Sequence, residues 1–210
     1  MTDEPGVILH DGIRFAVRET PYRQIRDVPE YETGDMGKND RVLDIGANIG
    51  AFALRAARIS QHVTAVEPVT ADLLEENIAL NNMPVRVIRA GLGNGQPREI
   101  VWDECRTVVP TFTLRNLIDM AGGCDFLKCD TEGAEWLIRP RDLDAIRRIE
   151  MELHIPPIGP PPNPALLAYI GEHYAFSIDR SPVYSTFGVM GILHATRKES
   201  FPQKKKQKVS

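Results

Sequence analysis

The sequence predicts an α/β fold: a mostly parallel, seven-stranded sheet with helices on both faces, an antiparallel edge strand and an N-terminal β-hairpin. Apolar runs of strand length alternate with segments of helical periodicity from residue 41 onward, which is typical of βαβ units. The last two strand-like runs have no helix between them, so they indicate an antiparallel edge. The chain has 210 residues, 42% of them hydrophobic, an ordinary composition for one globular domain.

Each element follows from its local pattern. Asp11-Gly12 is a hairpin turn signal between two short strands within 7–19, and Thr70 is suited to be a helix N-cap. We expect strands at 41–46, 62–68, 85–92, 124–130, 147–154, 175–181 and 187–197, and helices at 51–60, 70–82, 113–120 and 165–174. Residues 1–196 then form a single domain, with a hairpin and cap over 1–40 and an α/β core over 41–196. Residues 197–210 form a basic tail, which we expect to be disordered.

Charge and composition limit the classes of partner that we expect for this protein. The net charge is −4, although the tail from Arg197 onward is strongly basic, so the remaining body is more acidic than the whole chain. An acidic body argues against nucleic acid as a partner. The chain has no run of 18 apolar residues, no signal-like N-terminus and an odd number of cysteines, three. We therefore expect no membrane partner and a cytoplasmic location, and the sequence leaves the oligomeric state open.

The loop after the first core strand favours a nucleoside that carries no phosphates. Gly46 and Gly50 of GANIG let a ligand approach the backbone at a helix N-terminus. Asn48 stands where a dinucleotide fingerprint has its middle glycine, so a pyrophosphate would be crowded. Asp44 would repel phosphate and attract an ammonium group. Glu67 ends the next strand, where an acid can accept both ribose hydroxyls.

These features together describe S-adenosylmethionine, a nucleoside with a ribose, no phosphates and a positively charged amino-acid tail. We therefore predict S-adenosylmethionine as the cofactor and S-adenosylhomocysteine as the product. Residues Asp44, Gly46, Asn48, Gly50 and Glu67 form the predicted cofactor site.

The stretches VLDIGANIGAFALRAA, AVEP and DFLKCDTEGAEW resemble the FkbM family of S-adenosylmethionine-dependent methyltransferases. The resemblance covers roughly residues 40–155. It implies a Rossmann-like class I methyltransferase fold and methyl transfer, most often to a hydroxyl oxygen of a sugar or a natural product. It also implies that Pro68, Gly91 and Leu92 contact the cofactor.

Lys128 is an unusual residue for the inside of a predicted core strand. An unpaired buried charge costs several kcal/mol, so Lys128 needs an acidic partner. Glu150 and Glu152 of the next strand share a side by period-2 alternation, and we expect one of them to pair with Lys128. The alternative is that Lys128 is itself a catalytic group.

The acids that follow Lys128 are the predicted catalytic residues. Asp130 and Glu132 fall at the carboxyl end of the strand, where α/β sheets bind ligands. We expect them to face the methyl acceptor and accept its proton, with His154 as the next candidate base. A divalent metal on Asp130, Glu132 and Glu152 is an alternative that we do not favour.

The main functional hypothesis is O-methylation of a hydroxyl on a sugar or another small-molecule acceptor. The second hypothesis is an RNA, for example tRNA, methyltransferase that uses the basic tail. The third is a module that binds S-adenosylmethionine or a nucleotide without catalysis. The acidic body favours the first hypothesis over the second, and the acids of DTEGAE favour it over the third.

Overall fold

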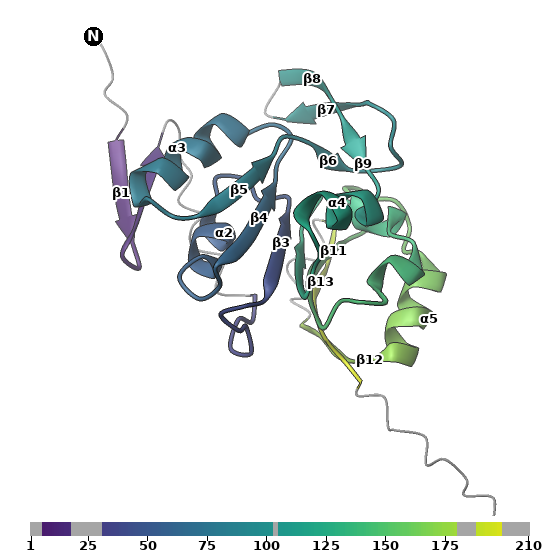
Figure 1. The fold of residues 1–210 in the computed structure, drawn as a ribbon. Coiled ribbons are helices and arrows are strands. Elements are labelled where there is room, and N and C mark those ends of the chain that lie inside the picture. Colours follow the sequence, from purple (N-terminus) through teal and green to yellow (C-terminus); the bar gives the residue numbers. More distant parts are fainter. Residues whose placement is uncertain (1–5, 18–30, 103–104, 180–187, 199–210) are drawn as a thin grey trace, which may run out of the picture.

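A computed structural model describes residues 6–17, 31–102, 105–179 and 188–198. Its centre is a seven-stranded sheet in the order β12-β13-β11-β10-β3-β4-β5 (Figure 1). The parallel strands are β3 (Arg41–Ile45), β4 (His62–Val66), β5 (Val85–Ile88), β10 (Phe126–Cys129) and β11 (Arg148–His154). Strand β13 (Val189–Arg197) runs antiparallel between β11 and the edge strand β12 (Tyr174–Asp179). The predicted sheet with its antiparallel edge is confirmed.

Helices cover both faces of this sheet. Helices α2 (Ala51–Ala56) and α3 (Ala71–Asn81) bury Phe52 and Leu74 against one face. Helices α4 (Leu114–Ala121) and α5 (Pro164–His173) bury Leu117 and Ile170 against the other. Two 3-10 turns, η2 (Ala134–Leu137) and η3 (Pro140–Leu143), connect β10 to β11. No helix among the described residues combines the length and the apolar character that crossing a membrane requires.

The predicted N-terminal hairpin is formed by β1 (Gly6–His10) and β2 (Ile13–Val17). It packs against α3, where the side chain of Asn77 accepts a hydrogen bond from the amide of Ala16 at 2.7 Å and that of Asn81 accepts one from the amide of Arg14 at 2.9 Å. Residues 18–30 lie outside the described part of the chain, so a cap role for them stays a prediction.

The predicted strand 85–92 is divided. Strand β5 ends at Ile88, because the amide of Ala90 donates to the Ile88 carbonyl at 3.0 Å and turns the chain out of the sheet. Strand β6 (Gly91–Leu92) then pairs with β9 (Thr111–Phe112). Between them β7 (Arg98–Trp102) and β8 (Cys105–Val109) form an antiparallel hairpin that projects beyond the sheet (Figure 1).

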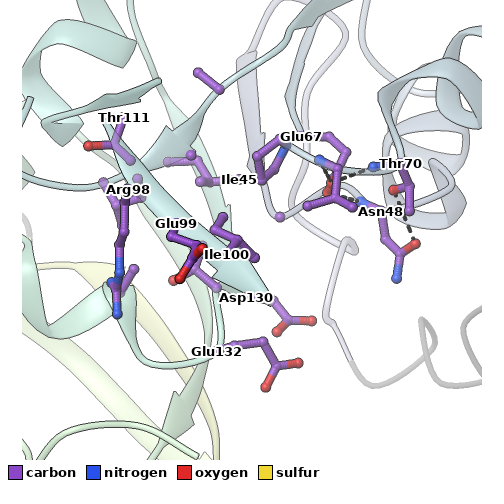
Figure 2. A pocket seen from close by; sticks show the side chains of 18 of the residues that line it. Ile45, Asn48, Glu67, Thr70, Arg98, Glu99, Ile100, Thr111, Asp130 and Glu132 are labelled. Carbon is purple, nitrogen blue, oxygen red and sulfur yellow. Dashed lines mark hydrogen bonds between the residues drawn. The ribbon is translucent and has the colours of Figure 1, made fainter. Parts of the chain in front are cut away.

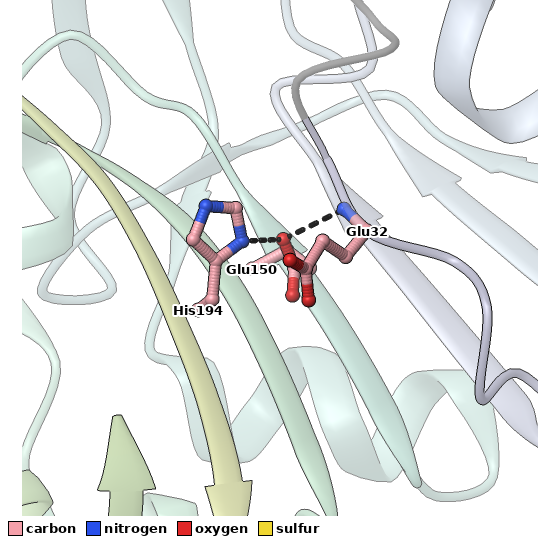
Figure 3. A group of neighbouring side chains, drawn as sticks. All are labelled: Glu32, Glu150 and His194. Carbon is pink, nitrogen blue, oxygen red and sulfur yellow. Dashed lines mark hydrogen bonds and ion pairs between the residues drawn. The ribbon is translucent and has the colours of Figure 1, made fainter. Parts of the chain in front are cut away.

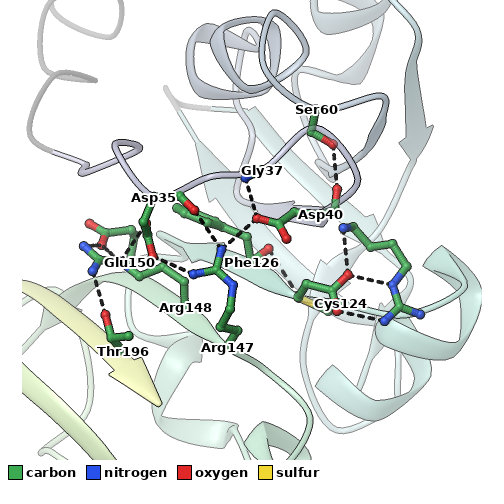
Figure 4. A network of polar contacts seen from close by, with 12 residues as sticks. Asp35, Gly37, Asp40, Ser60, Cys124, Phe126, Arg147, Arg148, Glu150 and Thr196 are labelled. Carbon is green, nitrogen blue, oxygen red and sulfur yellow. Dashed lines mark hydrogen bonds and ion pairs between the residues drawn. The ribbon is translucent and has the colours of Figure 1, made fainter. Parts of the chain in front are cut away.

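Residues 31–40 are attached to the start of β11 by ion pairs (Figure 4). The guanidinium of Arg147 contacts Asp35 at 2.6 Å and Asp40 at 2.7 Å. The neighbouring Arg148 donates to Glu32 at 2.5 Å. These contacts hold the segment over the face of the sheet that bears α2 and α3, and so they position Tyr31, which reaches the site described below.

The predicted boundary of the basic tail needs a correction. Arg197 is the last residue of β13, because its amide donates to the carbonyl of Arg147 at 2.8 Å. The ammonium of Lys198 donates to the carbonyls of Gly171 and Glu172 at 2.9 and 3.0 Å, at the end of α5. Both residues therefore belong to the folded domain. The expectation of disorder for 199–210 concerns residues outside the described part.

Candidate functional site

A cavity of about 520 Å³ lies at the carboxyl ends of the parallel strands (Figure 2), within the usual size range of ligand pockets. The predicted site residues that line it are Gly46, Asn48, Glu67, Pro68, Gly91, Leu92, Asp130 and Glu132. The other predicted residues do not line the cavity and are buried beside it: Asp44, Gly50, Lys128 and His154. The structure thus brings most of the predicted site together in one place.

The glycine loop has this shape because two strand ends approach each other closely. Gly46 has a φ of +75°, and a Cβ built on it would lie 1.7 Å from the Asp130 carbonyl oxygen. Only glycine fits at such a contact. Gly50 has a different role: a Cβ there would meet the side chain of Leu74 at 2.6 Å, so it allows α2 and α3 to pack closely.

Glu67 links the glycine loop to the residues that follow β4 while it faces the cavity. One carboxylate oxygen accepts from the amide of Asn48 at 2.9 Å, and the other accepts from the amides of Val69 and Thr70 at 2.7 and 3.0 Å. A carboxylate offers about four lone-pair positions, so an acceptor position is left for a ligand hydroxyl. Glu67 is therefore both a scaffold residue and a candidate ribose ligand.

Lys128 lies in a row of buried charged side chains that crosses the sheet. In register, Asp44 of β3 faces Lys128, Lys128 faces Glu150 of β11, and Glu150 faces His194 of β13. The Lys128 ammonium contacts Asp44 at 3.2 Å and donates to the Gly46 carbonyl at 2.9 Å. Burial lowers its pKa, but Asp44 and Asp130 outweigh this and raise the pKa above its ordinary value, so Lys128 stays charged.

We predicted that Lys128 pairs with a glutamate of β11, and this prediction is wrong. Glu150 instead accepts hydrogen bonds from Arg148 at 2.8 Å and from His194 at 2.6 Å. Asp44 takes its place, and within the described residues its carboxylate oxygens have no hydrogen bond of good geometry. The predicted attraction of Asp44 for an ammonium group stays a prediction, since this side chain has 0% exposure beneath the loop.

Asp130 lies at the wall of the cavity between Lys128 and Tyr31. The Tyr31 hydroxyl donates to Asp130 at 3.1 Å, and the Tyr31 ring stacks over the Lys128 ammonium at 5.3 Å. Burial and then the charge of Asp130 raise the pKa of Tyr31 well above its ordinary value, so this hydroxyl remains a donor. Glu132 follows with a φ of +50° and an exposed side chain, which Figure 2 shows beside Asp130.

His154 is buried behind these acids. Its amide and its Nδ1 both contact Glu135, at 2.7 and 3.1 Å. Burial lowers the pKa of His154, but the hydrogen bond to Glu135 and the charges of Asp130 and Glu132 raise it to about 9. A carboxylate oxygen of Glu152 lies 3.8 Å from the Nε2 of His154. Burial is the main reason that the pKa of Glu152 is raised to about 8, and the charge of Asp130 is the next. The wall of the cavity therefore carries carboxyl groups crowded around one imidazole.

Gly133, in the turn after β10, allows two backbone segments to approach each other closely. Its φ is +100°, and a Cβ there would lie 2.6 Å from the Cα of Gly159. The close approach is thus to the proline-rich loop 155–163. That loop brings Ile158, 44% exposed, to the cavity.

Sequence reasoning missed the hairpin β7–β8 and Tyr31 as parts of the site. Arg98, Glu99 and Ile100 of β7 line the cavity on the side opposite Glu67 (Figure 2). The one available signal was the extra length between the third core strand and the next helix. Nothing in the local sequence around Tyr31 indicates its contact with Asp130, which is 99 residues away.

The sheet order and the cavity at the carboxyl ends of the strands define a Rossmann-like methyltransferase fold. An rRNA methylase from Streptococcus thermophilus superposes with a TM-score of 0.52 at 10% identity, over 88% of this chain and 100% of that chain. A tRNA methyltransferase from M. jannaschii gives a TM-score of 0.53 at 14% identity, over 95% of this chain and 59% of that chain. At these identities the likeness establishes the fold.

The sequence matches one curated protein locally. The probable ribosomal RNA small subunit methyltransferase A of Methanothermobacter thermautotrophicus is 40% identical over 58 residues, which are 27% of this chain. The match spans about a fifth, 21%, of that relative's length. No family model matches the chain, so the resemblance to the FkbM family stays a prediction.

One expectation is overturned by these comparisons. A small-molecule acceptor was expected and nucleic acid was argued against, but the matched proteins are named as methyltransferases of ribosomal and transfer RNA. The physical reason is that net charge describes the whole chain, whereas RNA contacts depend on the charges around one opening. The cavity lining holds the arginine Arg98 beside four acids, Glu67, Glu99, Asp130 and Glu132.

Proposed function

We propose that this chain binds S-adenosylmethionine and transfers its methyl group to RNA. The observation that carries the proposal is the 58-residue stretch that is 40% identical to a probable ribosomal RNA methyltransferase. A cavity whose lining has both polar and apolar side chains, as a nucleoside ligand needs, supports it. The fold supports methyl transfer but does not distinguish acceptors.

The residues of the cavity fit the cofactor. Glu67, Asn48 and Thr70 form a polar end that would hold the ribose hydroxyls. Pro68 and Leu92 form an apolar wall that would contact the adenine. When bound, S-adenosylmethionine supplies a methyl group on a positively charged sulfur and leaves as S-adenosylhomocysteine.

The acids on the opposite wall would act on the acceptor. Asp130 and Glu132 would orient the acceptor's oxygen or nitrogen in line with the methyl group, which is the main requirement for transfer from an activated donor. A positioned carboxylate that takes the acceptor's proton contributes about 10²–10⁴-fold. Arg98, exposed at the opening, would contact a phosphate of the RNA backbone.

The test uses purified full-length protein with S-adenosylmethionine carrying a tritiated methyl group, and ribosomal RNA or tRNA as acceptor. We expect label in acid-precipitable material that ribonuclease removes. Asp130→Asn should lower this incorporation by about 10²-fold or more. Asp72→Asn is the matched control, because Asp72 lies on α3 with 80% of its side chain exposed.

Calorimetry separates the two parts of the proposal. S-adenosylmethionine should bind at micromolar levels, and NAD far more weakly. Tight cofactor binding without label in any RNA would refute the acceptor, whereas tighter binding of NAD would refute the cofactor.

A further inference from the structure

Three potential metal ligands from two neighbouring strands converge beside the cavity. They are Asp130, directly after β10, and Glu152 and His154 of β11. A carboxylate oxygen of Asp130 and one of Glu152 each lie 3.8 Å from His154 Nε2, and the three ligand atoms all lie within 4.8 Å of one another. Glu132, which also lines the cavity, lies 3.4 Å from the same nitrogen.

The orientation of His154 is the second observation. The residue is 1% exposed, and its Nδ1 lies 3.1 Å from Glu135, so Nε2 is aimed into the group of carboxylates. A metal-binding histidine is held in this way, with its other ring nitrogen on a carboxylate. Distances of 3.4 to 3.8 Å from Nε2 exceed the roughly 2.7–2.9 Å of a charged hydrogen bond, and they leave room between the ligands.

We propose that Asp130, Glu152 and His154 bind one divalent cation, and that Mn²⁺ fits this ligand set better than Mg²⁺. Carboxylates suit Mg²⁺ and Mn²⁺, while imidazole suits the transition metals, so one imidazole with two carboxylates favours Mn²⁺ over Mg²⁺. Ligands about 2.1 Å from a metal would be separated by roughly 3–4 Å, close to the spacing found here. Glu132 is placed to add a fourth ligand.

A second group of the same composition provides the contrast. Glu32, Glu150 and His194 also meet the spacing for a metal (Figure 3). There, however, Glu150 accepts from the amide of Glu32 at 3.0 Å and from His194 at 2.6 Å, and it is paired with Arg148. Arg148 hydrogen-bonds Glu150 directly and would repel a cation there. The Lys128 ammonium lies farther from the other group, 3.8 Å from Asp130, and is paired with Asp44 at 3.2 Å. The group around Asp130 is therefore the one that we assign.

The position of the proposed cation relates it to the cavity. Because Asp130 and Glu132 line the wall, the open side of the cation would face a ligand in the cavity. A divalent ion there would lower the pKa of a bound hydroxyl or hold a phosphate oxygen. This inference goes beyond the proposed function and does not require RNA to be the acceptor.

The test measures Mn²⁺ binding to the full-length chain after treatment with EDTA and dialysis, without cofactor or RNA. Electron paramagnetic resonance and calorimetry at pH 8 should show one equivalent of Mn²⁺ bound at micromolar levels. Asp130→Asn and Glu152→Gln should each weaken binding by about tenfold or more, since each removes a charged ligand. Glu32→Gln, in the contrasting group, should leave it unchanged.

Circular dichroism and thermal melting of each variant establish whether it folds. If one of the carboxylate variants does not fold, His154→Gln provides another variant that lacks a ligand. Binding weaker than millimolar in the native chain would overturn the proposal. Loss of binding in Glu32→Gln with retention in Asp130→Asn would overturn it too, by moving the ion to the other group.

Discussion

At the scale of single residues, the site depends on Lys128 as a charged link between three segments. Its ammonium contacts Asp44 of β3, the carbonyl of Gly46 in the glycine loop, and Asp130, at 3.2, 2.9 and 3.8 Å. The side chain is 5% exposed and that of Asp44 is 0% exposed, so this ion pair has little access to water. Lys128 therefore fixes the position of the glycine loop relative to Asp130.

Lys128→Met should destabilise the protein because it leaves Asp44 as an unpaired buried carboxylate. Removing one partner of a buried pair costs about 3–5 kcal/mol. Urea denaturation followed by circular dichroism measures the loss, with Lys38→Met as the control, since Lys38 is exposed. A Lys128→Met protein with native stability and no methyl transfer would instead make Lys128 a catalytic group.

At the scale of elements, the hairpin β7–β8 forms one wall of the opening. It emerges from the paired strands β6 and β9, and Thr111 Oγ1 donates to the carbonyl of Gln96 at 2.7 Å at its base. Its two described arginines differ: Arg98 lines the cavity, whereas Arg106 pairs with Glu99 at 3.3 Å. The hairpin therefore offers one arginine to a ligand at the opening and keeps the other in an ion pair.

Arg98→Ala should weaken RNA binding and reduce the slope of log affinity against log salt by about 1, as the loss of one phosphate contact does. Filter binding at several salt concentrations measures this, with Arg106→Ala as the control on the same hairpin. Cofactor affinity should stay unchanged. Equal effects of both substitutions would argue against a specific contact by Arg98.

At the scale of the whole molecule, buried ionisable groups extend across the sheet from Asp44 to His194 and along the end of β11. Their protonation is part of the free energy of folding. His154 has a pKa raised to about 9, so its stabilising contribution is complete below its unfolded pKa of about 6.5 and is lost as pH rises through 9. Glu152, with a pKa of about 8, also resists losing its proton in the folded state. Both shifts make the fold less stable as pH rises.

We therefore expect the free energy of unfolding of the EDTA-treated, cofactor-free protein to fall by about 2–3 kcal/mol between pH 6.5 and 9. Urea titrations at several pH values give this curve. His154→Gln should flatten it, and His62→Gln, at an exposed position, should not. A curve that rises over this range would contradict the structural account of these groups.

The sequence by itself determined the features that depend on local pattern. Apolar periodicity predicted most of the strands and helices. The glycine loop and Glu67 lie together at one wall of the cavity, and the binding of the cofactor at this wall stays a prediction. Parity along the strands predicted that a glutamate of the next strand lies near Lys128, and Glu150 is in register with it, although the predicted ion pair between them does not form. These features depend on neighbours within a few positions, so they can be read from spacing alone.

Only the tertiary structure decided which distant groups meet. Lys128 pairs with Asp44 rather than with Glu150, because Arg148 and His194 already occupy that glutamate. The predicted strand 85–92 leaves the sheet after Ile88. The hairpin β7–β8 that follows therefore forms a wall of the cavity. Spacing fixes the side of a strand on which a residue lies, but competition among charges across several strands selects its partner, and that competition exists only in the folded chain.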